Sequence, residues 1–155
     1  SDIDFTFNKA LVGDNLPLQG GTIVITFEAK DVNAFKSVTL SGTGLTMGSG
    51  ILGVQEIIED FSVNNFGIVG TANILVPAPD STPFSKVITL SKMTNHVKIK
   101  KTIFLDAPNS DTQQIIRDYA GVGLIEQKIE VVPEPASMAA LGLGFAALAA
   151  RRRRK

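Results

Sequence analysis

The sequence contains no cysteine and no tryptophan, and its 155 residues include one histidine and one tyrosine. Without cysteine, the chain has neither a disulfide framework nor thiol chemistry. A single histidine, His96, leaves too few preferred ligands for a zinc site. A histidine-based serine triad would depend on His96 alone, and we expect this residue to be an ordinary side chain beside a turn. The missing residue types therefore argue against the commonest hydrolytic sites.

Nucleotide-binding and esterase motifs are also absent. Residues 41–50 contain four glycines, but no Gly-Lys-Ser/Thr follows them. We interpret this stretch as a flexible connection, not as a phosphate-binding loop. No Gly-x-Ser-x-Gly elbow occurs, and no carboxylate pair points to glycoside hydrolysis. We expect a chain that is not an enzyme and holds no cofactor.

Charge is distributed unevenly along the chain. The formal net charge is zero, with 15 basic and 15 acidic residues, but residues 151–155 hold five of the basic ones. The 10 basic and 15 acidic residues that remain give residues 1–150 a net charge of −5. A mildly acidic body argues against nucleic acid as a partner.

The C-terminal residues 131–155 form three parts in a fixed order. Pro133, Glu134 and Pro135 come first, and the prolines hold φ at about −65° and disfavour helix upstream. The uncharged residues 136–150 would reach about 22 Å as a helix, against about 30 Å for the hydrocarbon core of a bilayer. We therefore predict a marginal and transient membrane span. Five basic residues end the chain and should stay on the cytoplasmic side, namely Arg151, Arg152, Arg153, Arg154 and Lys155.

This order resembles the PEP-CTERM sorting signal of Gram-negative bacteria, in which Val-Pro-Glu-Pro-Ala-Ser precedes a Gly/Leu/Ala-rich helix and an arginine cluster. The resemblance runs from Val132 to Arg154. It implies export, an inner-membrane intermediate, and an exosortase thought to cleave near the motif and pass the body to the cell surface or extracellular matrix. A sortase signal, Leu-Pro-x-Thr-Gly, is absent, and a GPI signal has no arginine cluster. A plain tail-anchored helix is the remaining alternative.

The N-terminus lacks the features of a signal peptide, because residues 1–4 are polar and have no basic, apolar prelude. Since the resemblance implies export, we expect a leader that was removed or that precedes this sequence.

Residues 1–132 are predicted to form a β-rich body, and residues 133–155 the separate sorting signal. The clearest alternation places Ile23, Ile25 and Phe27 on one strand face. Residues 51–63 also fit a helical stripe, but their β-branched residues favour strand. The expected strands are 5–8, 22–27, 37–41, 51–63, 66–76, 87–90, 97–105, 113–119 and 124–132, with a turn near 94–95 and a hairpin across 121–123. Eight or nine short strands predict an antiparallel β-sandwich, followed by one short hydrophobic C-terminal helix.

One predicted strand has a register problem. In residues 97–105, Val97, Ile99 and Ile103 share a face, and the alternation places Lys101 on that same face. We predict a β-bulge at Lys100 and Lys101 that turns the charge outward.

A few polar residues are candidates for binding. Asp106, Asn109 and Asp111 offer oxygen ligands of the kind that calcium prefers, although a solvated turn is the preferred interpretation because the EF-hand spacing and its distal glutamate are missing. Lys92, Lys98, Lys100 and Lys101 form a basic stripe, which we interpret as solubilising a strand face, with contact to anionic polysaccharide as the alternative. Asp2, Asp4, Glu59 and Asp60 are interpreted as surface charge.

The leading hypothesis, which rests on the resemblance, is an exported structural or adhesive protein of the cell surface, biofilm or exopolysaccharide matrix. A second hypothesis is a surface-fibre subunit whose edge strands pair between copies. A surface hydrolase is the third. The expected partners are an exosortase-type processing enzyme, exopolysaccharide or like subunits, and transiently the membrane through residues 136–150.

Overall fold

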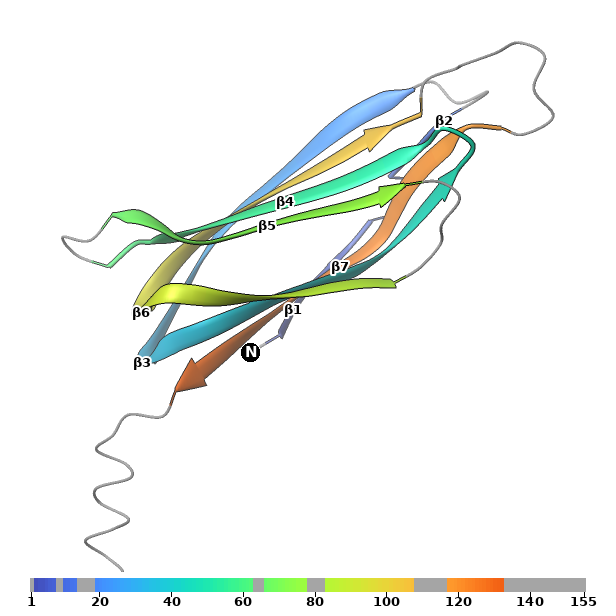
Figure 1. Ribbon diagram of the computed structural model, residues 1–155. Coiled ribbons are helices and arrows are strands. Elements are labelled where there is room, and N and C mark those ends of the chain that lie inside the picture. Colours follow the sequence, from blue (N-terminus) through green and yellow to red (C-terminus); the bar gives the residue numbers. More distant parts are fainter. Residues whose placement is uncertain are drawn as a thin grey trace, which may run out of the picture.

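The computed structural model describes residues 2–7, 10–13, 19–62, 66–77, 83–107 and 117–132. These residues form seven β-strands, joined by turns and by segments outside the described ranges (Figure 1). The strands are β1 (Asp2–Thr6), β2 (Leu11–Gly13), β3 (Gly20–Met47), β4 (Ile51–Asp60), β5 (Gly67–Pro77), β6 (Pro83–Asp106) and β7 (Tyr119–Val132).

Within the described ranges, all seven strands belong to one hydrogen-bonded sheet, and each of its strand pairs is antiparallel. The order is β1-β7-β3-β6-β4-β5, with β2 also paired to β7. The sheet is open, because β5 and β1 end the path without pairing to each other.

The long strands β3 and β6 give the sheet its shape, because they pair along most of their length and change register together in the middle. Register shifts fall between Lys30 and Phe35 and between Phe35 and Ser37. Such irregularities bend strands and increase their twist. Residues 20–30 of β3 pair with the second part of β6, which also binds β4, whereas residues 37–43 pair with the first part of β6 and also with β7.

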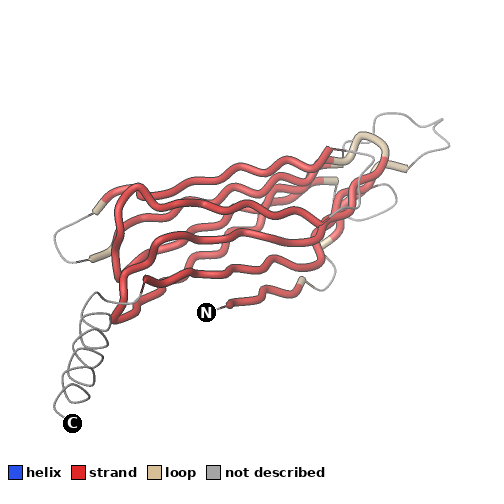
Figure 2. Tube along the Cα trace, turned by 60° about the horizontal axis from the view of Figure 1, so that its bottom comes forward, coloured by secondary structure: helices blue, strands red, loops and turns tan. Residues whose placement is uncertain are grey.

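The bend divides the sheet into two halves that pack against each other (Figures 1 and 2). We call them the β4 half, which consists of β4, β5 and residues 20–30 and 96–106, and the β7 half, which consists of β7, β1, β2 and residues 35–47 and 83–89. A Cβ on Gly70 of β5 would lie 2.8 Å from Ile88 of β6, and a Cβ on Gly44 of β3 would lie 2.1 Å from Leu52 of β4. The core therefore lies between the halves.

The core is built from alternate residues of every long strand, as period-two patterning requires. Leu40, Leu52, Ile99, Ile103 and Ile125 are fully buried and come from both halves. Each such side chain contributes roughly 1.5–3 kcal/mol when it leaves water.

The structure confirms an all-β antiparallel body but corrects the expected number of strands. The described residues form seven strands and not eight or nine. The predicted strands 22–27 and 37–41 are both parts of β3, and 87–90 and 97–105 are both parts of β6, whereas β2 was not predicted. No turn separates the latter pair at residues 94–95, because Thr94 is buried and bonded inside the bend. The polar residues that resembled a turn instead mark a corner of a continuous strand.

The predictions for two glycine-containing segments, residues 41–50 and 121–123, were also wrong. Residues 41–47 are part of β3 and not a connection, and the turn comes at Gly48, whose φ of 61° favours glycine. Gly121, Val122 and Gly123 lie within β7, so they are not the tip of a hairpin. The ladder between β3 and β7 shifts register there, between Thr43 and Gly44, so these glycines accompany an irregularity in a strand.

Two predicted elements lie wholly or mostly outside the described residues. They are the C-terminal helix from residue 136 and the strand at 113–119, of which only residues 117–119 are described and only Tyr119 belongs to a strand, β7. Among the described residues, no helix is long and apolar enough to cross a membrane. The boundary at residues 132 and 133 stays a prediction, and β7 ends at Val132.

Candidate functional site

The sequence-predicted sorting segment follows directly on a strand that is paired on both sides. β7 pairs with β3 along one edge and with β1 and β2 along the other. Its last residue, Val132, pairs with Ala34 of β3. The sorting residues Pro133, Glu134 and Pro135, the run 136–150 and Arg151, Arg152, Arg153, Arg154 and Lys155 lie outside the described residues. The structure therefore shows that the paired strand β7 runs up to Val132, immediately before the predicted sorting segment.

A shallow groove crosses the outer face of the β4 half. Its floor is Gly53 of β4, which pairs with Phe104 of β6 on one side and with Leu75 of β5 on the other. Both neighbours are exposed apolar side chains. The groove measures about 370 Å³, and its lining includes the polar side chains of Gln55, Asn73 and Thr102.

The chemistry of this groove suits a neutral polyhydroxylated ligand. The Gln55 and Asn73 side chains each carry both donors and acceptors, and the Thr102 hydroxyl does likewise. Phe104 adds an exposed aromatic surface at the edge. Sequence reasoning missed the groove, although Gly53 was visible as an interruption of an apolar segment. The sequence alone does not show that Gly53, Phe104 and Leu75 lie side by side, because their placement depends on strand register.

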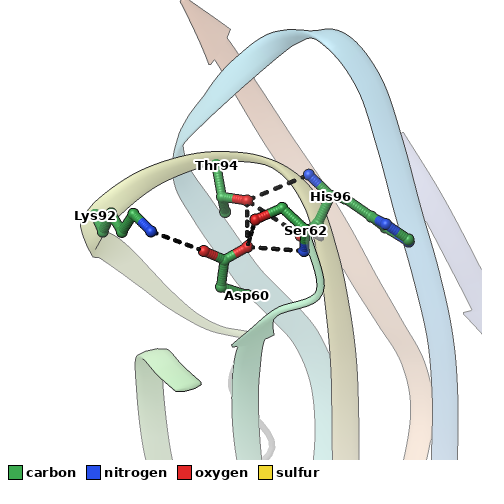
Figure 3. A network of polar contacts seen from close by, with 5 residues as sticks. All are labelled: Asp60, Ser62, Lys92, Thr94 and His96. Atoms are coloured by element: carbon green, nitrogen blue, oxygen red, sulfur yellow. Dashed lines mark hydrogen bonds and ion pairs between the residues drawn. The ribbon is translucent and has the colours of Figure 1, made fainter. Parts of the chain in front are cut away.

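A second polar cluster lies where β4 ends against the bend of β6 (Figure 3). Asp60 Oδ1 accepts hydrogen bonds from the Thr94 hydroxyl at 2.6 Å and from the Ser62 hydroxyl and backbone N–H at 2.7 and 3.0 Å. Lys92 Nζ lies 3.3 Å from Asp60 Oδ2. The backbone N–H of Phe61 donates to the carbonyl of His96, at 2.8 Å. These bonds join the end of β4 to the corner of the sheet.

The Asp60 carboxylate is held in its charged form. Burial by itself raises the pKa of Asp60, but the hydrogen bonds from Ser62, Thr94 and Lys92 together outweigh it and hold the pKa well below its usual range. The interpretation of Asp60 as surface charge was wrong, because its side chain is 2% exposed. Because hydroxyl, backbone amide and amine groups already bind this carboxylate, we interpret Asp60 as a structural residue.

Another cluster of polar side chains lies in the middle of the core. Lys101 of β6, Glu56 of β4 and Gln127 of β7 are each fully buried. Lys101 Nζ donates to Glu56 Oε2 and to Gln127 Oε1. The predicted bulge is wrong, because Lys101 pairs with Ile25 and Glu56 and the register continues unshifted through Lys100.

The alternation that pointed Lys101 inward was therefore correct. The sequence did not show that an acid and an amide from two other strands meet this lysine inside the core. Lys101 is therefore not part of the predicted basic stripe, because it faces the core while Lys92 and Lys100 are exposed.

The remaining candidate residues are dispersed. His96 lies within β6 and not beside a turn, with its Nε2 3.1 Å from Glu28 Oε2 and its ring edge-on to Phe61. Asp106 ends β6, whereas the other calcium candidates, Asn109 and Asp111, lie outside the described residues. In the part of the chain that the structure describes, no three His, Cys, Asp or Glu side chains are grouped to hold a metal ion.

The fold and the C-terminus together define an all-β antiparallel body that leads into a sorting signal. Residues 131–154 match the model of the PEP-CTERM protein-sorting motif. This motif implies an exported protein that is sorted at the membrane and processed by an exosortase. No curated protein matches the chain.

Several solved structures match the chain at low sequence identity. A chain from the structure of the infectious bursal disease virus Gx strain matches with a TM-score of 0.47 and 15% identity, over 84% of this chain and 32% of the viral one. The carbohydrate-binding module CBM36, solved with calcium and xylotriose, matches with a TM-score of 0.37 and 16% identity, over 83% of this chain and 99% of the module. The chain thus spans about a third of the first of these matches.

Proposed function

We propose that this chain is a structural or adhesive protein of the cell surface, biofilm or exopolysaccharide matrix, released to that location by cleavage near its sorting motif. The observation that carries the proposal is the PEP-CTERM match at residues 131–154, which begins within the last two residues of β7. The basic end of the chain keeps residues 151–155 on the cytoplasmic side while the folded body is outside. Processing then frees the body from its transient membrane span at residues 136–150.

The body has an adhesive role in this proposal, and not an enzymatic one. The groove over Gly53 supports it, because it combines one exposed aromatic ring with amide and hydroxyl groups on a rigid sheet face. Neutral sugars offer hydroxyls to such amides and apolar ring faces to such an aromatic side chain. Exopolysaccharide is therefore the proposed ligand.

The sorting step is tested by replacing Pro133, Glu134 and Pro135 with alanine in the producing cell. We expect an unprocessed precursor that stays in the membrane fraction, whereas Lys128→Ala, an exposed change in β7, should be processed normally. Mass spectrometry of the protein released by unaltered cells should find residues 151–155 missing. Released protein that still carries those residues would contradict the proposal.

A fibre subunit is the second candidate, and the composition of β5 favours it. Gly67–Pro77 contains no charged residue, and β5 ends the strand order. Ile68 and Leu75 on this strand are exposed. Exposed and uncharged edge strands readily pair with another chain, so two copies of the body could join here.

A further inference from the structure

Three groups that can react with one another are in contact inside the core. They are the Lys101 amine, the Gln127 carboxamide and the Glu56 carboxyl, and each side chain is 0% exposed. Lys101 and Glu56 belong to the β4 half, as cross-strand partners in β6 and β4. Gln127 belongs to β7, where it pairs with Leu40 of β3. The contact therefore joins the two halves of the sheet.

Glu56 touches both of the other groups, one with each of its oxygens. Oε2 accepts from Lys101 Nζ, and Oε1 accepts from Gln127 Nε2 at 3.2 Å. The same Gln127 nitrogen also donates to the backbone carbonyl of Thr39 at 3.2 Å. The carboxamide is thus fixed in orientation, with its oxygen toward the amine and its nitrogen toward the acid.

The surroundings favour a reactive amine. Burial lowers the pKa of Lys101, although the charge and hydrogen bond of Glu56 act in the opposite direction. A desolvated, neutral lysine is a good nucleophile. Ile99 and Ile103 flank it on β6 and are fully buried, so water that would hydrolyse an intermediate is kept away.

We propose that Lys101 and Gln127 form an intramolecular isopeptide bond as the chain folds, with Glu56 transferring the proton. The Lys101 Nζ lone pair attacks Gln127 Cδ to form a carbon–nitrogen bond. A proton leaves Nζ for Glu56 and is passed to Gln127 Nε2, the bond from Cδ to Nε2 breaks, and ammonia departs. The product is a secondary amide between the two side chains, and no oxidant or co-reactant is required.

The fixed positions of the three groups favour the reaction. Amides react slowly with amines in water, but groups held in contact in a fixed orientation reach effective concentrations of about 10⁵–10⁸ M. An acid that bridges nucleophile and leaving group supplies general acid–base catalysis at the same place. A plain buried ion pair would be a weak stabilising device, because apolar residues of similar size often do as well or better.

The bond would tie β7 to the opposite half of the body. β7 is the strand that continues into Pro133, so the strand next to the processing site could not be peeled away without breaking a covalent bond. A surface protein held or pulled through either end would resist unfolding at this strand.

Intact-mass spectrometry of the purified chain under denaturing conditions tests the proposal. We expect each molecule to be lighter than its sequence mass by one ammonia. A tryptic digest should contain the Lys101 peptide joined to the Gln127 peptide and uncut after Lys101, because trypsin does not cleave after an acylated lysine. Lys101→Arg and Glu56→Gln should both have the full sequence mass, whereas Lys100→Arg, an exposed change next in β6, should keep the loss of ammonia.

The unaltered chain decides the outcome even if a core variant fails to fold. A full sequence mass in folded, unaltered protein overturns the proposal and leaves a non-covalent buried pair. A loss of ammonia that maps to any other pair of residues overturns it as well.

Discussion

The hydroxyl of Thr94 donates a 2.6 Å hydrogen bond to the carboxylate of Asp60, and this bond joins the last residue of β4 to the bend of β6. Both side chains are buried. The contact lies where the sheet folds over, so it bears on how the two halves are held together.

We predict that Asp60→Ala lowers the free energy of unfolding by about 2–4 kcal/mol, because buried Thr94 and the Ser62 N–H lose a charged acceptor. Lys92 contributes little to this loss, because its side chain is 51% exposed and solvent screens such pairs. Urea unfolding followed by circular dichroism measures the change. Asp4→Ala is the control, as Asp4 is exposed in β1, and it should alter stability by less than about 0.5 kcal/mol. Equal effects of both changes would show that the Asp60 cluster does not brace the corner.

The same carboxylate should make stability depend on pH in the acid range. Its pKa is lower in the folded chain than the ordinary value of 3.8. Its contribution is therefore complete at neutral pH and is lost as the pH falls below about 4, where the unfolded chain binds a proton that the folded chain resists. Unfolding curves between about pH 2 and pH 7 should show a shallower acid limb in Asp60→Asn than in the unaltered chain. The same loss of stability at acid pH in both chains would show that the acid sensitivity comes from other groups.

Filling the groove should weaken polysaccharide binding without disturbing the fold. A Cβ on Gly53 would lie 3.6 Å from Phe104 and 3.9 Å from Leu75, which are ordinary contacts, so Gly53→Ile is expected to be accommodated in β4. We expect at least a tenfold loss of affinity for the producing cell's exopolysaccharide, about 1.4 kcal/mol, measured by affinity electrophoresis. Gly67→Thr is the matched control on β5, since a Cβ there meets nothing within 4 Å. Unchanged binding in the Gly53 variant would remove the groove from the proposed function.

A charge on the β5 edge separates the fibre hypothesis from that of a solitary adhesin. Thr71 is exposed in the middle of β5, and a lysine on an edge strand opposes pairing with another chain. If the body assembles, Thr71→Lys should suppress the assembly seen by light scattering and electron microscopy, whereas Gln55→Lys on β4, which is paired on both sides, should not. Bodies that stay monomeric at high concentration would speak against the fibre.

Local pattern predicted most of the strands but not their continuity. Ile23, Ile25 and Phe27 alternate as a half-buried strand should, and so do the residues of β7 from Ile125 onward. The merging of two predicted strands into β6 could not be read from its own residues. It depends on Asp60, 34 residues away from Thr94, which satisfies the hydroxyl that made the corner look like an exposed turn.

Lys101 shows the same limit within the core. Its inward direction followed from the alternation of Val97, Ile99 and Ile103, but a lone lysine among apolar residues is normally turned out to solvent. Its partners, Glu56 and Gln127, come from other strands, 45 and 26 residues away. Polar groups that are satisfied across a sheet leave little trace in a single strand, and the same holds for the groove residues around Gly53.

The C-terminal motif, in contrast, could be read from sequence because all of its parts are contiguous. Pro133, Glu134 and Pro135, the uncharged run and the basic end need no tertiary partner to be recognised, and residues 131–154 match the PEP-CTERM model.

The pairing of Val132 with Ala34 has a consequence for processing. The next residue along the chain is Pro133, so the chain supplies no spacer between folded surface and sorting motif. A processing enzyme that binds this motif therefore comes close to the paired end of β7. Access of the enzyme to the motif therefore depends on the space that the folded body leaves beside Val132. It also depends on how readily the terminal pair of Val132 and Ala34 opens.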